Sequence, residues 1–326
     1  MIGLPEIIAG VIAISLNAYA LTGGADFGGG VWDLLATGPR RDRQRELIAE
    51  SIAPIWEANH VWLIVVIVVL FTAFPAAFGM LGIVLHIPIT VLLIGIMMRG
   101  SAFVFRSYGP QGRGRNVWGT TFAIASVVTP FFLGIVIGAV VSGRVAEAAT
   151  RIGSTTFVDV FIRSWADTIP VAVGVFALVL FAFLAATYLT VEAEDDALRE
   201  DFRKRALVAA AAVIVSGAVV DIPVVLIVQA AATMAAAIAF GALWVRRYRV
   251  ARVAAAAEVS FVLWGWLFAQ YPYVIPPALT IREAAAPAVT LRLLAIGLAA
   301  GAVVLLPSLH YMLRVFKTKR PTSSNF

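Results

Sequence analysis

Long apolar stretches, separated by short polar segments, make up most of this chain. A helix of about 20 apolar residues crosses the roughly 30 Å hydrocarbon core of a bilayer, so stretches of this kind predict membrane spans. We expect an all-α, polytopic membrane protein whose transmembrane helices, about nine in number, pack as two four-helix bundles plus one peripheral helix. The predicted spans are approximately Pro5–Ala25, Ala53–Phe74, Leu81–Phe103, Val117–Val141, Ile169–Thr190, Ala206–Val220, Val224–Val245, Val253–Tyr271 and Val289–Phe316.

The sixth and seventh spans are the pair hardest to separate, because Ala206–Val245 is almost continuously apolar. The break between them is Asp221-Ile222-Pro223. Proline lacks a backbone N–H, and the residue before a proline avoids the α region. We therefore expect a tight hairpin at this break and not one very long helix.

The basic residues test the span count. If nine spans are right, 20 of the 25 lysines and arginines fall on one side of the membrane. The positive-inside rule then places the N-terminus outside and the C-terminus in the cytoplasm. The five on the outer side are Arg144, Arg151, Arg163, Arg282 and Arg292.

Composition agrees with a membrane protein and excludes several other classes. Hydrophobic residues make up 61% of the 326 residues and charged residues 13%, which is far from the balance of a soluble domain. The formal charge of +6 follows from topology, since no basic face or nucleic-acid motif is present. The absence of cysteine excludes disulfides and thiolate metal sites within this sequence. Residues 2–23 lack a basic leader region, so we expect a retained first span and one membrane domain over residues 1–326.

The stretch SIAPIWEANHVWLI, residues 51–64, places titratable groups at the start of an apolar span. A charged side chain at membrane depth costs about 2.5–3.5 kcal/mol, so Glu57 requires a partner, a proton or a water path. Glu57 and His60 are three residues apart and share a helix face, which suits proton transfer between them. One alternative is an ion pair of Glu57 with Arg99 or Arg106. Another is a di-metal site, although such sites need two Glu-x-x-His motifs and the chain has one.

Two further acids lie near the predicted cytoplasmic side. Asp26 sits in GGADFGGG, residues 23–30, at the predicted end of the first span, where the helix dipole disfavours a negative charge. The alternative for Asp26 is a solvated residue at a glycine-rich helix exit. Glu258 lies just over one turn into the eighth span.

The other polar residues of the spans also have two interpretations. Arg99 and Arg106 are either positive-inside anchors or partners of the acids. His86 and His310 could ligate haem iron or pack as hydrogen-bonded residues. Trp62 points away from Glu57, toward a neighbouring helix or lipid.

Four local patterns coincide with one known family: DFGGG at 26–30 followed by Trp32, SIAPIWEANHVWLI at 51–64, RGSAFVFR at 99–106 and AQYPYVIP at 269–276. With these patterns the chain resembles subunit II of cytochrome bd ubiquinol oxidase, the family that includes the cyanide-insensitive type. Many members have aspartate where this chain has Glu57, and some have histidine where it has Ile55. The short hairpin at Asp221 also departs from members with a long outer loop there.

The resemblance implies the second subunit of a respiratory heterodimer in the bacterial cytoplasmic membrane, which oxidises quinol and reduces dioxygen to water. Haems b558, b595 and d would belong to the partner, subunit I. Asp26 and Glu57, with His60 beside them, would line a cytoplasmic proton pathway, and Trp62 would lie near an oxygen route. A quinone or lipid within this chain and a small accessory subunit are left undecided. Three histidines and no cysteine are too few ligands for several haems, so we expect no firmly bound cofactor, metal ion or catalytic residue here.

Two other functions are compatible with the composition. A proton-coupled secondary transporter could use Asp26 and Glu57 as protonation sites, and would be expected to show broken helices at corresponding places in two halves. A purely structural assembly subunit would need no proton path.

Overall fold

The computed structural model describes residues 3–52, 56–108, 113–220 and 225–318. Within these ranges the chain forms helices and one small antiparallel hairpin of β1 (Tyr273–Ile275) and β2 (Leu279–Thr280). The helices are α1 (Leu4–Leu34), α2 (Arg41–Ile52), α3 (Trp56–Ala73), α4 (Pro75–Val84), α5 (His86–Tyr108), α6 (Arg113–Val141), α7 (Arg144–Thr150), α8 (Phe157–Phe161), α9 (Thr168–Glu192), α10 (Asp196–Val219), α11 (Leu226–Trp244), α12 (Tyr248–Gln270) and α13 (Ala288–Thr318).

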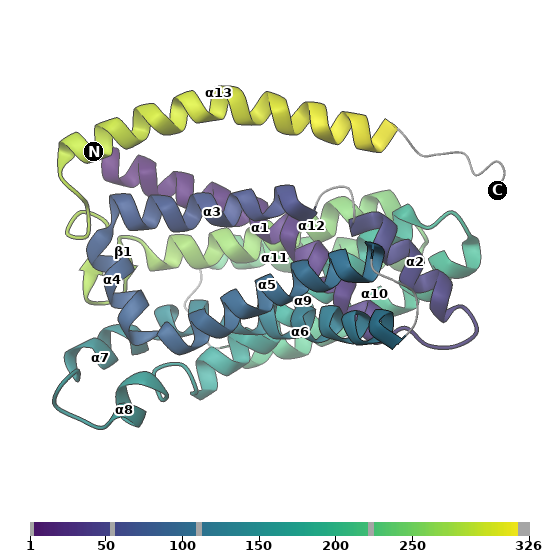
Figure 1. Cartoon of the computed structure of the whole chain (residues 1–326), viewed down its shortest axis with the longest axis horizontal. Helices are drawn as coiled ribbons and strands as arrows, with labels where there is room; N and C mark the ends of the chain where they lie inside the picture. The colour runs from purple at the N-terminus through teal and green to yellow at the C-terminus, as the bar shows by residue number, and fades with distance from the viewer. Residues whose placement is uncertain (1–2, 53–55, 109–112, 221–224, 319–326) are drawn as a thin grey trace.

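The long helices run back and forth along one axis (Figure 1). Among the described residues, eight helices are long and apolar enough to cross a membrane, where the sequence pattern predicted nine spans. The difference is α10, which packs beside α9 but begins with the charged segment DALREDFRKR. Its apolar part, residues 206–219, is about 21 Å long at 1.5 Å per residue, so the sixth predicted span is only the inner part of a longer helix.

Helices α1 and α9 form the centre of the bundle. On one side α1 packs with α3 and α6, and α6 packs with α5; on the other side α9 packs with α10 and α12, and α12 with α11. This arrangement confirms a polytopic all-α fold with two groups of four helices, α1, α3, α5 and α6 against α9–α12. The indole N–H of Trp32 donates a 2.7 Å hydrogen bond to the carbonyl oxygen of Ala182, which links the two groups.

Glycines in α1 permit the close approach of α1 to its neighbours. A Cβ atom at Gly28 would lie 2.0 Å from the carbonyl oxygen of Phe181, and one at Gly30 would lie 2.1 Å from the hydroxyl of Ser126. Small residues allow membrane helices to pack closely and gain van der Waals contact. The glycine-rich segment is therefore a packing surface inside α1, which continues to Leu34, beyond the span end predicted near Ala25.

Helix α13 is the peripheral helix. It lies along the outside of the bundle in Figure 1 and contacts α3 and α1. Only 6% of its apolar window is buried, and side chains such as Val303 and Val304 are about 70% exposed. An apolar helix of this kind faces lipid or another membrane subunit.

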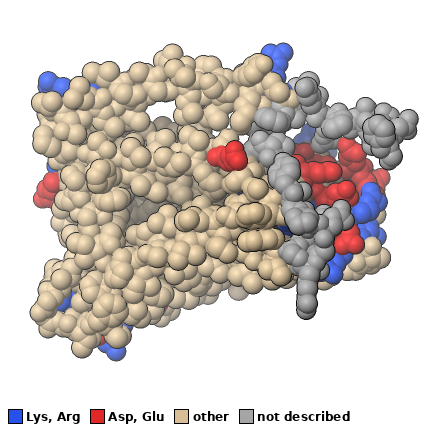
Figure 2. All heavy atoms as spheres, in the orientation of Figure 1, with Lys and Arg blue, Asp and Glu red and all other residues tan. Residues whose placement is uncertain are grey.

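On the face shown in Figure 2, most charged side chains gather toward the two ends of the bundle, and the broad band between them is nearly free of charged residues. At one end Arg40, just before α2, pairs with Asp201 of α10 at 2.6 Å. At the other end Arg282 pairs with Glu6 at 2.6 Å. The arginine clusters that follow the first span and precede the sixth thus share one end, as predicted; which end faces the cytoplasm remains a prediction.

Several connections were not predicted. Helix α4 separates the second and third predicted spans, α7 and α8 lie within residues 142–167, and the β hairpin follows α12. The predicted tight turn at Asp221–Pro223 lies outside the described residues.

Candidate functional site

A group of polar side chains lies inside the bundle where α1, α3, α5 and α6 meet. We call Tyr19, Asp26, Asn59, His60, Arg99 and Ser126 the buried polar cluster. The side-chain amide of Asn59 donates a hydrogen bond to the carboxylate of Asp26. The guanidinium Nε of Arg99 donates a 3.2 Å hydrogen bond to Ser126 Oγ. These contacts join helices that are separated in sequence by tens of residues.

Arg99 is the charged centre of the buried polar cluster. It is 1% exposed, and its guanidinium carbon lies 4.7 Å from the ring centre of Phe27 and 5.2 Å from that of Phe122. Cation–π contacts of this kind stabilise a desolvated guanidinium by about 2 kcal/mol, less than the cost of burying an unpaired charge. Asp26, the acid of the buried polar cluster, is the residue of this group that can supply an opposite charge.

Three aromatic rings lie close to the imidazole of His60. Its ring centre is 6.1 Å from that of Tyr19, and 6.3 Å from those of Phe27 and Trp56. Among the described residues, His60 Nδ1, Tyr19 Oη and Arg99 Nη2 are buried and have no hydrogen-bond partner in this chain. Buried polar atoms of this type are normally satisfied by ordered water.

Glu57 lies outside the buried polar cluster. Its side chain is exposed in the first turn of α3, whereas Asn59 two residues later is buried. The cause is helix geometry, since two residues correspond to about 200° of rotation. Within the described ranges Glu57 forms no ion pair, so the predicted alternative of a buried pair with Arg99 or Arg106 is wrong.

Arg106 instead forms a bidentate ion pair with Asp33. Two guanidinium nitrogens of Arg106 each donate a 2.9 Å hydrogen bond to an Asp33 oxygen, and Asp33 is 1% exposed. Arg45 lies 3.9 Å from the same carboxylate. We did not identify Asp33 from the sequence. Its position seven residues after Asp26, two turns further on the same helix face, was the available signal.

The other predicted residues lie apart from the buried polar cluster or at its margin. Trp62 is half-buried against the hydrophobic core. His86 is exposed, with Nδ1 2.9 Å from the carbonyl oxygen of Ile83, and the side chain of His310 is not described. In the part of the chain that the structure describes, no group of three or more histidine or acidic side chains could hold a metal ion. Glu258 is 5% exposed in α12 and forms no ion pair with any residue that the structure describes.

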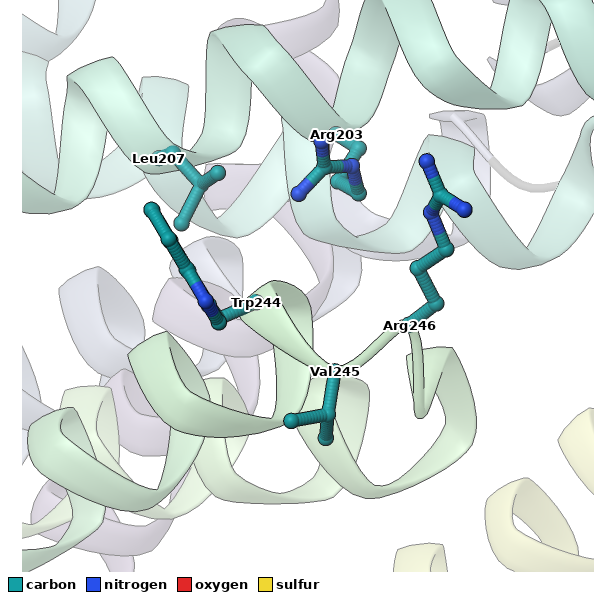
Figure 3. Close-up of a pocket in the computed structure, with 5 residues that line it drawn as sticks. All are labelled: Arg203, Leu207, Trp244, Val245 and Arg246. Carbon is teal, nitrogen blue, oxygen red and sulfur yellow. The ribbon is translucent and has the colours of Figure 1, made fainter.

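A surface pocket of about 400 Å³ lies at the α2 end of the bundle, between α10 and the turn after α11. Arg203 lines it from α10, and Trp244, Val245 and Arg246 line it from the opposite side (Figure 3). Glu200 already pairs with both arginines, at 2.6 Å and 3.6 Å. This one carboxylate is shared between two guanidinium groups, so it offsets one of the two positive charges of the pocket.

The fold and the buried polar cluster together define a polytopic membrane protein that holds ionisable groups within its helix bundle. Residues 4–316 match the family model for cytochrome bd terminal oxidase subunit II, so the chain belongs to this family. The resemblance inferred from the four sequence patterns is thereby confirmed.

Individual relatives share shorter regions with this chain. It is 31% identical to cytochrome bd-I ubiquinol oxidase subunit 2 of Escherichia coli (strain K12) over 133 residues, 41% of this chain and 35% of that protein. It is 27% identical to a putative cytochrome bd menaquinol oxidase subunit II of Bacillus subtilis (strain 168) over 190 residues, 58% of this chain and 54% of that protein. The matched regions thus span between about a third and about half of these relatives.

The fold is also similar to that of a solved structure. The bd oxidase from Geobacillus thermodenitrificans contains a chain that superposes with a TM-score of 0.72 at 21% identity, covering 97% of this chain and 99% of that one. At this identity the comparison concerns the fold alone.

Proposed function

We propose that this chain, as one membrane domain, works with a haem-bearing subunit I in a bd-type quinol oxidase and conducts protons through its buried polar cluster. The observation that carries the proposal is the buried polar cluster itself. Ionisable groups within membrane helices are costly and usually functional, and here Asp26, His60 and Arg99 come from three different helices. Reduction of dioxygen to water consumes protons, and this chain would supply them from the cytoplasm.

The side chains suit stepwise transfer. Asp26 accepts the hydrogen bond of Asn59, while Tyr19 and His60 present buried polar atoms without a partner in this chain. Water bound to those atoms would connect the carboxylate with the imidazole. Arg99 stabilises the negative charge that remains when Asp26 has passed on its proton.

Glu57 would act at the surface that meets the partner. Its exposed carboxylate is followed on α3 by exposed apolar side chains, among them Ile64 at 56% and Phe71 at 59%. An isolated charge on a lipid-facing surface costs about 2.5–3.5 kcal/mol, and a protein partner that pairs with it removes this cost. We therefore assign Glu57 to proton transfer between the subunits. Trp62, half-buried five residues further along α3, would line an oxygen route.

Haems b558, b595 and d are assigned to the partner subunit. The rings of Tyr19, Phe27 and Trp56 lie within 6.3 Å of the His60 ring centre, and such crowding disfavours a haem at this imidazole. The haems supply electron transfer and oxygen chemistry in the partner, and the residues of this chain hold and move protons. Quinol would be the electron donor.

Variants of the acids test this function. Asp26→Asn and Glu57→Gln keep side-chain size but remove the exchangeable carboxyl proton. We expect oxygen consumption by the purified complex to fall at least about tenfold, since a positioned proton donor or acceptor contributes 10² to 10⁴ in rate, with haem absorbance unchanged. Asp42→Asn, an exposed acid of α2, is the matched control.

Three outcomes separate the alternatives. Full activity in both variants would refute the proton path. Loss of haem absorbance together with activity would support a purely structural role in assembly. A chain that purifies without any haem-bearing partner would contradict the oxidase complex itself. The transporter alternative has no supporting observation, and the family match over residues 4–316 disfavours it.

A further inference from the structure

A second cavity, unrelated to the buried polar cluster, is a groove of about 680 Å³ on the outer surface of α11 and α12. Met234 and Ile238 line it from α11, and Val250, Val253 and Phe261 line it from α12. These side chains are between 38% and 71% exposed. We refer to this feature as the α11–α12 groove.

The α11–α12 groove is apolar along its length and basic at one end. Of the described residues that line it, Arg249 is the one polar side chain. From Arg249 to Phe261 the groove follows twelve residues of α12, about 18 Å at 1.5 Å per residue. This length is close to the roughly 15 Å of hydrocarbon in one leaflet of a bilayer.

The charge of Arg249 is uncompensated within the described chain. Its neighbours Arg246 and Arg252 pair with Glu200 at 3.6 Å and with Glu192 at 2.9 Å. Arg249 has no hydrogen bond, ion pair or ring contact in the ranges that the structure describes. It also lies in the first turn of α12, where the helix dipole disfavours a cation. Neither an ion pair within the described residues nor the stability of α12 explains why an arginine stands at position 249.

We propose that the α11–α12 groove is a binding site for one anionic phospholipid of the surrounding leaflet, with an acyl chain along the apolar walls and the phosphate at Arg249. Basic residues where membrane helices meet the interface are suited to anionic headgroups. A quinone would fill the same apolar walls but has an uncharged head, which leaves the charge of Arg249 unmatched. The proposal concerns a surface distinct from the proton path and does not depend on it.

The test is lipid retention by the intact purified protein, with whichever subunits accompany it, measured by native mass spectrometry. Phosphatidylglycerol and phosphatidylcholine with identical acyl chains are titrated into delipidated samples. We expect phosphatidylglycerol to be retained preferentially and Arg249→Gln to weaken that retention about fivefold, because one basic residue at an anionic surface contributes about that factor. Ala257→Phe, which fills the groove, should abolish it. Arg41→Gln, an exposed arginine of α2, removes the same charge elsewhere and should have no effect.

Several results would overturn the proposal. Equal retention of the two lipids, or unchanged retention in Arg249→Gln, would show that the headgroup charge is not recognised. Stabilisation by inorganic phosphate alone would indicate a site for free anions. If the mass spectrum shows a bound molecule with the mass of a quinone, and Arg249→Gln retains it equally well, the groove would be a quinone site. A second copy of the chain whose binding protects the groove from lipid would make it a dimer interface.

Discussion

The contact between α1 and α9 at Gly28 provides a quantitative test of the packing. In Gly28→Ala the new Cβ atom would lie 2.0 Å from the carbonyl oxygen of Phe181 and 2.7 Å from the Cβ of Ala185. Ordinary van der Waals contact begins near 3.4 Å, so the two helices must separate by about 1.4 Å at this point. The nearest atom belongs to the backbone, and rotation of a side chain cannot relieve the clash.

We expect Gly28→Ala to lower the free energy of unfolding by about 1–3 kcal/mol or more, the range for overpacked interiors. Gly10→Ala is a matched control on the same helix, because nothing lies within 4 Å of its added Cβ. In the control, the better helix propensity of alanine should stabilise the protein by up to about 1 kcal/mol.

The measurement is thermal unfolding of the purified complex, with oxygen consumption recorded on the same samples. Gly28→Ala should also reduce activity, since Asp26 is two residues away on the displaced helix. If Gly28→Ala and Gly10→Ala unfold at the same temperature, the close packing of α1 on α9 is incorrect.

Two further predictions concern ion pairs. Removing one partner of the buried Asp33–Arg106 pair, as in Asp33→Asn, leaves an uncompensated charge and should destabilise the protein by about 3–5 kcal/mol. In a double-mutant cycle measured by thermal unfolding, adding Arg106→Gln should recover part of the stability lost in Asp33→Asn. Additive losses in the two variants would contradict direct pairing. At the α2 end, the hydrogen bond from Arg40 lowers the pKa of Asp201. Because that pKa is below its unfolded value near 3.9, this stabilisation is complete above about pH 4 and is lost as the pH falls through the lowered pKa. Asp201→Asn should remove this part of the acid dependence in unfolding curves measured from pH 7 to pH 3, and an unchanged profile would refute the assignment.

The hydropathy pattern was sufficient to predict the membrane class, the positions of the long helices and the segregation of charge. These properties depend on how many apolar side chains each segment contains. That number is set by the sequence and does not depend on how the helices pack. The same pattern placed the end of the first span near Ala25, because three of the next five residues are glycines, which have low helix propensity. The structure continues α1 to Leu34, where α9 packs against Gly28 and α6 packs against Gly30.

The environment of each ionisable group depended on tertiary structure. Asp26 and Glu57 were both predicted as acids near the cytoplasmic side, yet the structure buries Asp26 beside Asn59 and exposes Glu57. Asp33, which the sequence did not single out, is paired with Arg106. The partners lie 33 and 73 residues away in sequence. Local sequence determines whether a segment enters the membrane, because the free energy of transferring a helix from water to lipid is nearly the sum of the contributions of its residues. Which charge meets which partner depends on the faces that neighbouring helices bring together, and only the packed bundle decides that.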